Sequence, residues 1–180
     1  MEIFPVPLST EKIKENSSFS TSTSNQKIID KAIAFHKKGE IIKAINYYQF
    51  LIDSNIKDPR IFSNYSIILY DLGKFDKAEE LVLKAIKIKP DLAEAHNTLG
   101  NILRDIGKSR EAERSFRKAI DINPSLAGAY SNLGNVLNDL GNLKEAELNT
   151  RKAIDLDPDS HTALSNLGST LIDLGKLNEA

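Results

Sequence analysis

The sequence contains no cysteine, which excludes disulfide bonds, thiolate metal sites and a cysteine nucleophile. No apolar run approaches the ~18 residues that a membrane-spanning helix needs. Lysine and arginine total 24 against 25 acidic residues, so we expect no nucleic-acid partner. The N-terminal segment has neither a basic start nor an apolar stretch. We therefore expect no secretory signal and a cytoplasmic protein.

An internal repeat of 34 residues runs through most of the chain. Glycines and, five residues after each, alanines recur at this interval: Gly39, Gly73, Gly107, Gly141 and Gly175, with Ala44, Ala78, Ala112, Ala146 and Ala180. Three prolines and the alanines five residues before them keep the same period: Pro90, Pro124 and Pro158, with Ala85, Ala119 and Ala153. The chain is therefore an array of repeats with a period of 34 residues.

The residue pattern within each unit predicts two helices. The first, over 93–106, carries an apolar stripe at spacings of three and four, formed by His96, Leu99, Leu103 and Ile106. Gly107 ends it, because glycine adopts a left-handed turn at little cost. The second, over about 109–121, points Ala112, Phe116, Ala119 and Ile120 inward and stops before the proline.

Helix starts and close helix contacts also have sequence signals. The residue after each marker proline is expected to cap the next first helix, as Asp91, Ser125 and Asp159. At the first junction, Asp58 is the expected cap and Pro59 the first helical residue. Small residues indicate close helix approach, and enlarging one would cost roughly 1–3 kcal/mol. They are Gly100, Gly134, Ala112, Ala146, Ala119 and Ala153.

The pattern H-x2-L-G-x2-L…A-x3-F-x2-A…P at 96–124 resembles the tetratricopeptide repeat. It recurs one unit later in Tyr130, Leu133, Gly134, Leu137, Ala146, Ala153 and Pro158. The resemblance covers about 25–180. It implies an all-α solenoid of about nine helices in antiparallel pairs, wound as a right-handed superhelix, and a scaffold that binds a peptide or protein. Lys31-Ala32 and Tyr65-Ser66 replace Leu-Gly in the first two units, and Thr150 replaces the usual aromatic.

The repeat divides the chain as follows. Residues 1–24 are expected to be a disordered Ser/Thr-rich leader. A divergent unit at 25–58 precedes units at 59–92, 93–126 and 127–160, and an incomplete unit spans 161–180. The apolar stripe of the last unit, Leu164, Leu167, Leu171 and Leu174, lacks its own second helix. Three explanations are open: a fragment of a longer protein, a stable chain with a frayed end, or self-association through this exposed face.

No pattern in the chain indicates catalysis, and no metal or cofactor is expected. Gly107-Lys108-Ser109 is similar to the end of a phosphate-binding loop, but Ile102 occupies the place of the required glycine and no strand precedes it. The histidines, His36, His96 and His161, lie at no metal-ligand spacing. His96 sits where Tyr130 sits one unit later, which predicts a packed aromatic substitute.

A row of asparagines carries the functional hypothesis. Asn64, Asn132 and Asn166 share one register, which Thr98 fills in the third unit. Asparagine is a mediocre helix former, and its amide both donates and accepts, which suits the backbone of an extended peptide. The array is similar to that of O-linked N-acetylglucosamine transferase, whose inner surface carries an asparagine ladder. That resemblance implies a concave peptide groove. Surface polarity inherited through duplication is the alternative. The candidate groove residues are Asn64, Asn97, Thr98, Asn101, Arg104, Asn132, Asn135 and Asn166.

A second row is acidic and ends the first helices, as Asp71, Asp105, Asp139 and Asp173. Carboxylates at a helix C-terminus oppose the helix dipole, so they either attract a basic partner or are neutralised by Arg104, Lys108 and Lys176. No lysine or arginine occupies the groove registers that a clamp for free C-terminal carboxylates would need. The sequence thus predicts a non-enzymatic scaffold. The alternative is the N-terminal recognition region of a larger glycosyl- or sulfotransferase-type enzyme.

Overall fold

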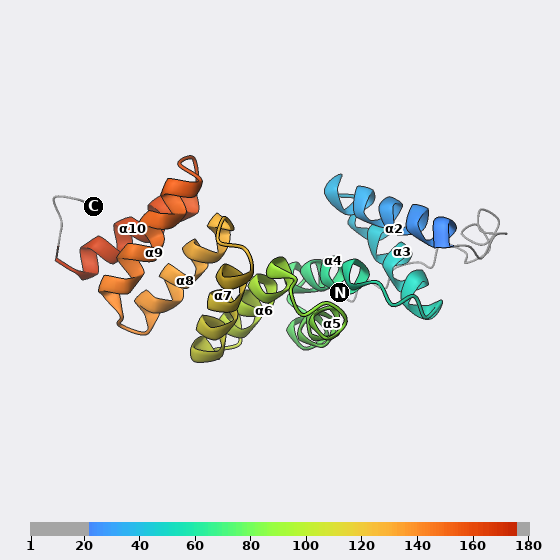
Figure 1. The fold of residues 1–180 in the computed structure, drawn as a ribbon, viewed down its shortest axis with the longest axis horizontal. Coiled ribbons are helices and arrows are strands. Elements are labelled where there is room, and N and C mark those ends of the chain that lie inside the picture. The colour runs from blue at the N-terminus through green and yellow to red at the C-terminus, as the bar shows by residue number, and fades with distance from the viewer. Residues whose placement is uncertain (1–21, 176–180) are drawn as a thin grey trace. The chain divides into compact units, whose positions relative to one another are not determined.

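The computed structural model describes residues 22–175, which form nine α-helices and contain no strand (Figure 1). The helices are α2 (Ser22–Lys37), α3 (Ile41–Asp53), α4 (Pro59–Asp71), α5 (Phe75–Ile88), α6 (Ala93–Asp105), α7 (Ser109–Ile122), α8 (Ala127–Asp139), α9 (Leu143–Leu156) and α10 (His161–Asp173). Most of the expected leader and the last five residues of the 161–180 unit lie outside the described residues.

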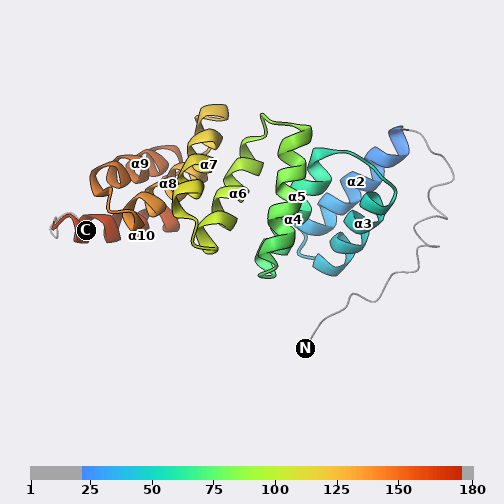
Figure 2. The same cartoon turned by 90° about the horizontal axis from the view of Figure 1, so that it is seen from below.

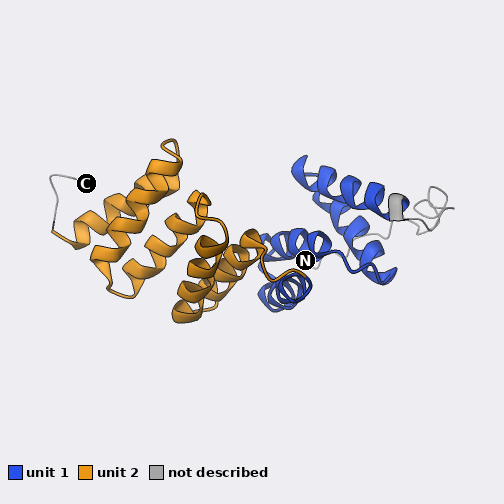
Figure 3. Ribbon diagram, in the orientation of Figure 1, with its two compact units in different colours: residues 1–88 blue, residues 89–180 orange. Residues whose placement is uncertain are grey.

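The helices gather into two compact units, residues 1–88 and 89–180 (Figure 3). In the first, α2 packs on α3 and α4 on α5, with α3 against α4. In the second, α6 packs on α7 and α8 on α9, while α10 packs on α9 and on α8. Figure 2 shows these helix pairs within each unit from a second side. Paired helices are the predicted α-solenoid fold, which is thereby confirmed. The right-handed superhelix stays a prediction.

The marker glycines end the first helices as predicted. Gly107 has a φ of 80°, which places it in the left-handed region that disfavours a Cβ. Its N–H donates to the Arg104 carbonyl at 2.9 Å, and the Lys108 N–H donates to the Leu103 carbonyl at 2.8 Å. These two bonds make a Schellman motif, which satisfies carbonyls that the helix end would otherwise leave unpaired. The other four marker glycines also have positive φ.

Small residues lie where paired helices approach most closely, also as predicted. A Cβ built on Gly100 of α6 would lie 2.4 Å from Cε1 of Phe116 on α7. A Cβ on Gly134 of α8 would lie 2.2 Å from Oγ1 of Thr150 on α9. The marker alanines of these second helices are buried, namely Ala112, Ala119, Ala146 and Ala153. A large side chain on one helix therefore fills a notch that a glycine leaves on the other.

The predicted caps of α6, α8 and α10 are wrong by one residue. The helices begin after Leu92, Leu126 and Ser160, and only Ser160 caps with its side chain. The reason is visible before α8, where the Asn123 side chain accepts from the Ser125 N–H at 3.1 Å. This turn uses Ser125 and delays the helix start. The predicted cap Asp58 is confirmed, because it accepts from the Arg60 N–H at 2.9 Å ahead of α4.

Candidate functional site

Side-chain amides join the first helices of the second unit. Nδ2 of Asn132 on α8 donates to Oδ1 of Asn97 on α6 at 3.1 Å. Nδ2 of Asn166 on α10 donates to Oγ of Ser131 on α8 at 3.1 Å and to the Ser131 carbonyl at 3.3 Å. Ser131 stands one repeat after Asn97, and Asn166 one repeat after Asn132. The same bond therefore occurs twice, and we call these two bonds the asparagine rungs.

Further amides extend the rungs toward the C-terminal ends of α8 and α10. Nδ2 of Asn135 lies 3.4 Å from Oδ1 of Asn166. Nδ2 of Asn138 donates to Oδ2 of Asp173 at 2.9 Å. Oδ1 of Asn101 is buried and has no partner among the described residues. A continuous polar row thus lies over α8 and α10, and one acceptor of α6 is left unsatisfied beside it.

Three other predicted groove residues form their polar contacts within their own helices. Thr98 donates its hydroxyl to the Glu94 carbonyl of its own helix at 2.9 Å. Arg104 pairs with its neighbour Asp105 at 3.0 Å. Asn64 belongs to the first unit, where its amide donates to the Arg60 carbonyl at 2.8 Å.

Of the eight predicted groove residues, the structure brings together Asn97, Asn132, Asn135 and Asn166 through direct hydrogen bonds. It also adds residues that were not predicted, Ser131, Asn138 and Asp173. Ser131 could have been found from the 34-residue interval that separates it from Asn97. Asn138 could have been found in the same way, because it stands 34 residues after Arg104, and Asp173 already belongs to the acidic row.

The rungs use only part of the hydrogen-bonding capacity of the asparagine side chains. A neutral amide has two N–H donors and a carbonyl oxygen with two acceptor positions. The rung from Asn132 uses one N–H, and no described group donates to its Oδ1. Amides that are half used by the fold can hold repeats in register and still offer an acceptor to a ligand backbone.

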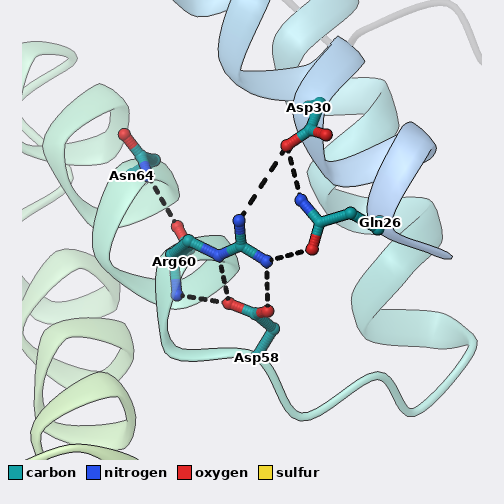
Figure 4. A network of polar contacts seen from close by, with 5 residues as sticks. All are labelled: Gln26, Asp30, Asp58, Arg60 and Asn64. Carbon is teal, nitrogen blue, oxygen red and sulfur yellow. Dashed lines mark hydrogen bonds and ion pairs between the residues drawn. The ribbon is translucent and has the colours of Figure 1, made fainter. Parts of the chain in front are cut away.

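The first unit carries a different polar cluster, centred on Arg60 of α4 (Figure 4). Its guanidinium donates to both carboxylate oxygens of Asp58 at 3.0 and 2.7 Å. It also donates to Oε1 of Gln26 on α2 at 2.7 Å. Asp30 of α2 accepts from Gln26 at 2.6 Å and lies 3.9 Å from Arg60. The cluster therefore ties α2 to the start of α4, and of its members only Asp30 shares a register with the rung residues.

Arg60 also sets the protonation of this cluster. Its hydrogen bond to Asp58 is the main cause that holds the pKa of that carboxyl below its usual 3.8, against a smaller opposing effect of burial. Asp30 lies one repeat before Asn64 and so begins the asparagine register with a carboxylate. The register is thus charged only at Asp30 and neutral in the later repeats, as Asn64, Thr98, Asn132 and Asn166.

The acidic row is partly neutralised within the chain. Asp105 is paired with Arg104, and Asp173 accepts a hydrogen bond from Asn138. Asp139 is exposed, and no described cation lies within ion-pair distance of it. Asp71 of the first unit is also exposed. Within the acidic row, Asp105 and Asp173 therefore have partners in the chain, while Asp139 stays open to a basic partner.

A cavity of about 950 Å³ lies away from the asparagine rungs, at the turn between α6 and α7 and the start of α9. Its walls mix Lys108, Arg110 and Arg114 with Glu111 and Glu113. It includes Gly107-Lys108-Ser109, which here form a helix-ending turn. None of the candidate groove asparagines lines it, so we place the site on the first helices, where the hydrogen bonds repeat.

The described residues include no group of three or more histidine, aspartate or glutamate side chains that could hold a metal ion. Among the described helices, none is both long and apolar enough to cross a membrane.

Comparison with known proteins identifies the fold. Models of the tetratricopeptide repeat match residues 31–52, 57–125 and 127–160. Comparison with curated protein sequences finds no match.

Solved structures resemble the chain at low identity. A crystal structure of MamA protein is 23% identical with a TM-score of 0.71, covering 86% of this chain and 85% of that one. MamA from Desulfovibrio magneticus RS-1 is 21% identical with a TM-score of 0.73, covering 86% and 88%. The first repeat domain of Spaghetti (RPAP3), bound to the HSP90 peptide SRMEEVD, is 21% identical with a TM-score of 0.63, covering 67% and 98%. The similar structures show the fold, and the matches to the family models show the family. The chain belongs to the tetratricopeptide repeat family.

Proposed function

We propose that the chain is a protein-interaction scaffold that holds an extended peptide along the first helices of its second unit. The observation that carries the proposal is the pair of asparagine rungs between α6, α8 and α10. They place half-used amides at the same position of successive repeats. A similar fold, the RPAP3 domain, is bound to a peptide, which supports a peptide as the ligand.

The spacing of the rungs suits an extended backbone. Packed helices lie about 8–10 Å apart, and an extended chain rises about 3.3 Å per residue. Successive rungs would therefore meet every third residue of a peptide. Contacts of this kind reach the peptide backbone, so the scaffold would tolerate varied side chains at the intervening positions.

Charge narrows the class of peptide. Arg104 is the one cation among the candidate groove residues, and its guanidinium is paired with Asp105. Asp139 is exposed without a described ion-pair partner. The face therefore favours a neutral or basic peptide over an acidic tail, because an acidic tail would bring carboxylates against carboxylates.

Asn101 allows a test that leaves the rungs intact. The Asn101 side chain is half-buried and makes no hydrogen bond among the described residues. Its Oδ1 is buried, so Asn101→Ala removes a potential N–H donor to the ligand without breaking a rung. A library of unstructured synthetic peptides would be screened against the whole chain, and the best binder titrated by calorimetry. Losing one hydrogen bond to a ligand should weaken binding by roughly 1 kcal/mol, or about fivefold.

The matched control is Asn149→Ala on the second helix α9. Asn149 is an equally half-buried asparagine, and its amide donates to the Glu145 carbonyl of its own helix at 2.8 Å. Binding should survive this change within about twofold, with helical content unchanged in both variants. If the Asn101 variant binds the peptide as tightly as the parent, or if both variants lose affinity equally, the first helices are not the binding site.

The transferase alternative uses the same face. If the repeats are the recognition region of a larger glycosyl- or sulfotransferase-type enzyme, the native product would be much heavier than 20.0 kDa. An immunoblot of the source cell with intact mass spectrometry separates the two proposals. The same cells, fractionated, test the proposed cytoplasmic location.

Self-association is a second candidate activity, favoured by the face of α10. No described atom lies within 4 Å of a Cβ built on Gly168, unlike the filled notches at Gly100 and Gly134. Leu164 and Ile172 of the same helix are 47% and 56% exposed. Sedimentation of the whole chain over a range of concentrations tests it. A monomer at every concentration, or an oligomer that survives Leu164→Glu, would exclude this face as the contact.

A further inference from the structure

Helix α2 and the turn after it carry lysines at positions where the later repeats have apolar residues. The positions equivalent to Lys27 are all fully buried, namely Ile61, Ala95, Ala129 and Ala163. The positions equivalent to Lys31 are Tyr65, Leu99, Leu133 and Leu167, and those equivalent to Lys38 are Leu72, Ile106, Leu140 and Leu174. All three lysines are exposed. We call Lys27, Lys31 and Lys38 the lysine stripe.

Lys27 and Lys31 lie on one side of α2, and Lys38, the first residue after the helix, continues that side. At about 100° per residue, their Cα positions fall within an arc of roughly 40°, and they span about 16 Å along the axis. The buried residues of α2, Ile29 and Ala32, fall on the opposite side. The stripe therefore faces away from the core of the first unit and does not take part in its packing.

The stripe lacks the ion pairs that the second helices have. Those helices pair acids and bases four residues apart, as Glu80 with Lys84 at 2.6 Å and Glu113 with Arg117 at 2.9 Å. Lys27 and Lys31 have the same spacing with like charge, which destabilises a helix. No described carboxylate pairs with any of the three lysines.

The acid of α2 does not relieve this repulsion. Asp30 accepts from Gln26 and lies beside Arg60, as Figure 4 shows. A solvated face that only kept the helix soluble would gain from mixed charges. A face of one sign, held at a cost to its own helix, fits a partner of the opposite sign.

We propose that the lysine stripe is a docking surface for an acidic segment of another protein. Lys27 and Lys31 are about 6 Å apart along the axis, and Lys31 and Lys38 about 10 Å. Side chains on one face of an extended chain recur every second residue, at intervals of about 6.6 Å. The segment that fits best therefore carries carboxylates at positions p, p+2 and p+6, with the flexible lysine side chains covering the remaining difference in length. This surface is separate from the proposed peptide face of the second unit.

Other partners fit the stripe less well. A membrane-surface helix needs large apolar side chains beside its lysines, and the apolar residue that borders the arc is the small Ala34. The nearest aromatic along the chain, Phe35, is half-buried with its ring 5.3 Å from that of Tyr47. Nucleic-acid binding favours arginine, which is absent from α2 and α3. A second copy stacking through apolar contacts would have to bury three unpaired ammonium groups.

The test uses the whole chain, labelled for NMR, and a short Gly/Ser peptide with glutamates at p, p+2 and p+6. Amide shifts should move in α2 and the turn after it. Charge reversal of the stripe, as Lys27→Glu with Lys31→Glu and Lys38→Glu, should weaken binding about tenfold or more. The neutral triple variant, with glutamine at the same three positions, should weaken binding by a smaller factor. This variant provides the test if the charge-reversed chain does not fold.

The matched control reverses three exposed lysines of the second unit, Lys118, Lys144 and Lys152. It changes the net charge equally and should bind within about twofold of the parent. Asn101→Ala should also bind normally, which separates this surface from the peptide face.

Three results would overturn the proposal. They are unchanged binding by both stripe variants, an equal loss in the control, and equal binding of a peptide with glutamine in place of glutamate. Tighter binding to phosphatidylserine vesicles than to the peptide, lost in the stripe variants, would assign the surface to a membrane instead.

Discussion

Gly100 offers the sharpest test of the packing between paired helices. A Cβ at this position would lie 2.4 Å from Cε1 and 2.6 Å from Cδ1 of Phe116, where ordinary contacts are 3.4–4 Å. Phe116 is fully buried, so its ring has to move by about 1 Å into packed neighbours. We therefore expect Gly100→Ala to destabilise the chain, although alanine is the better helix former.

The expected magnitude is a difference of two opposing effects. Overpacking a filled core costs typically 1–3 kcal/mol, and replacing glycine by alanine within a helix returns roughly 0.5–1 kcal/mol. The free energy of unfolding should fall by about 1–2 kcal/mol. Gly128→Ala in α8 is the matched control, because nothing described lies within 4 Å of its Cβ, and it should be neutral or slightly stabilising.

Urea unfolding followed by circular dichroism measures both variants. Phe116→Val should rescue Gly100→Ala in a double-mutant cycle, with a coupling energy of about 1 kcal/mol or more. The second repeat already has this solution, since it places Ser66 opposite Val82 at the equivalent positions. If Gly100→Ala is as stable as Gly128→Ala, or if the cycle shows no coupling, the notch does not control the helix contact.

Three further predictions concern single side chains. Ala112→Leu should lower the melting temperature, because Ala112 is fully buried and the added atoms cost roughly 1–3 kcal/mol; an unchanged melting curve would contradict the close contact. Asp58 has its pKa lowered, first by the hydrogen bond from Arg60, so its contribution is present above the unfolded pKa and lost as pH falls through the folded value. Between pH about 7 and about 3, the parent should therefore lose more stability than Asp58→Asn. Burial lowers the pKa of His36, against a smaller opposing effect of Asp71, so its NMR titration should have a midpoint below 6.5, and one above that value would refute the buried placement.

The sequence by itself determined the fold class, the helix pairing and the turns. These features depend on local signals that recur in every unit. An apolar stripe selects the buried side of a helix, glycine at the end of the first helix allows a positive φ, and small residues mark close contacts. Gly107, Ala112 and Gly134 could be assigned this way because their roles follow from backbone sterics and side-chain volume, which the residue type fixes. The leader, the unit boundaries and the cytoplasmic location stay predictions.

Only the tertiary structure decided which polar side chains meet. The register predicted Asn64 and Asn132 as equivalents, yet one bonds a carbonyl of its own helix and the other bonds Asn97 of the preceding repeat. Asp30 shares that register and turns to Gln26 and Arg60. A hydrogen bond depends on the rotamer of both partners and on a neighbouring helix about thirty residues away, and a one-residue offset changes the partner. Apolar burial tolerates such offsets because it is non-directional, whereas hydrogen bonds do not.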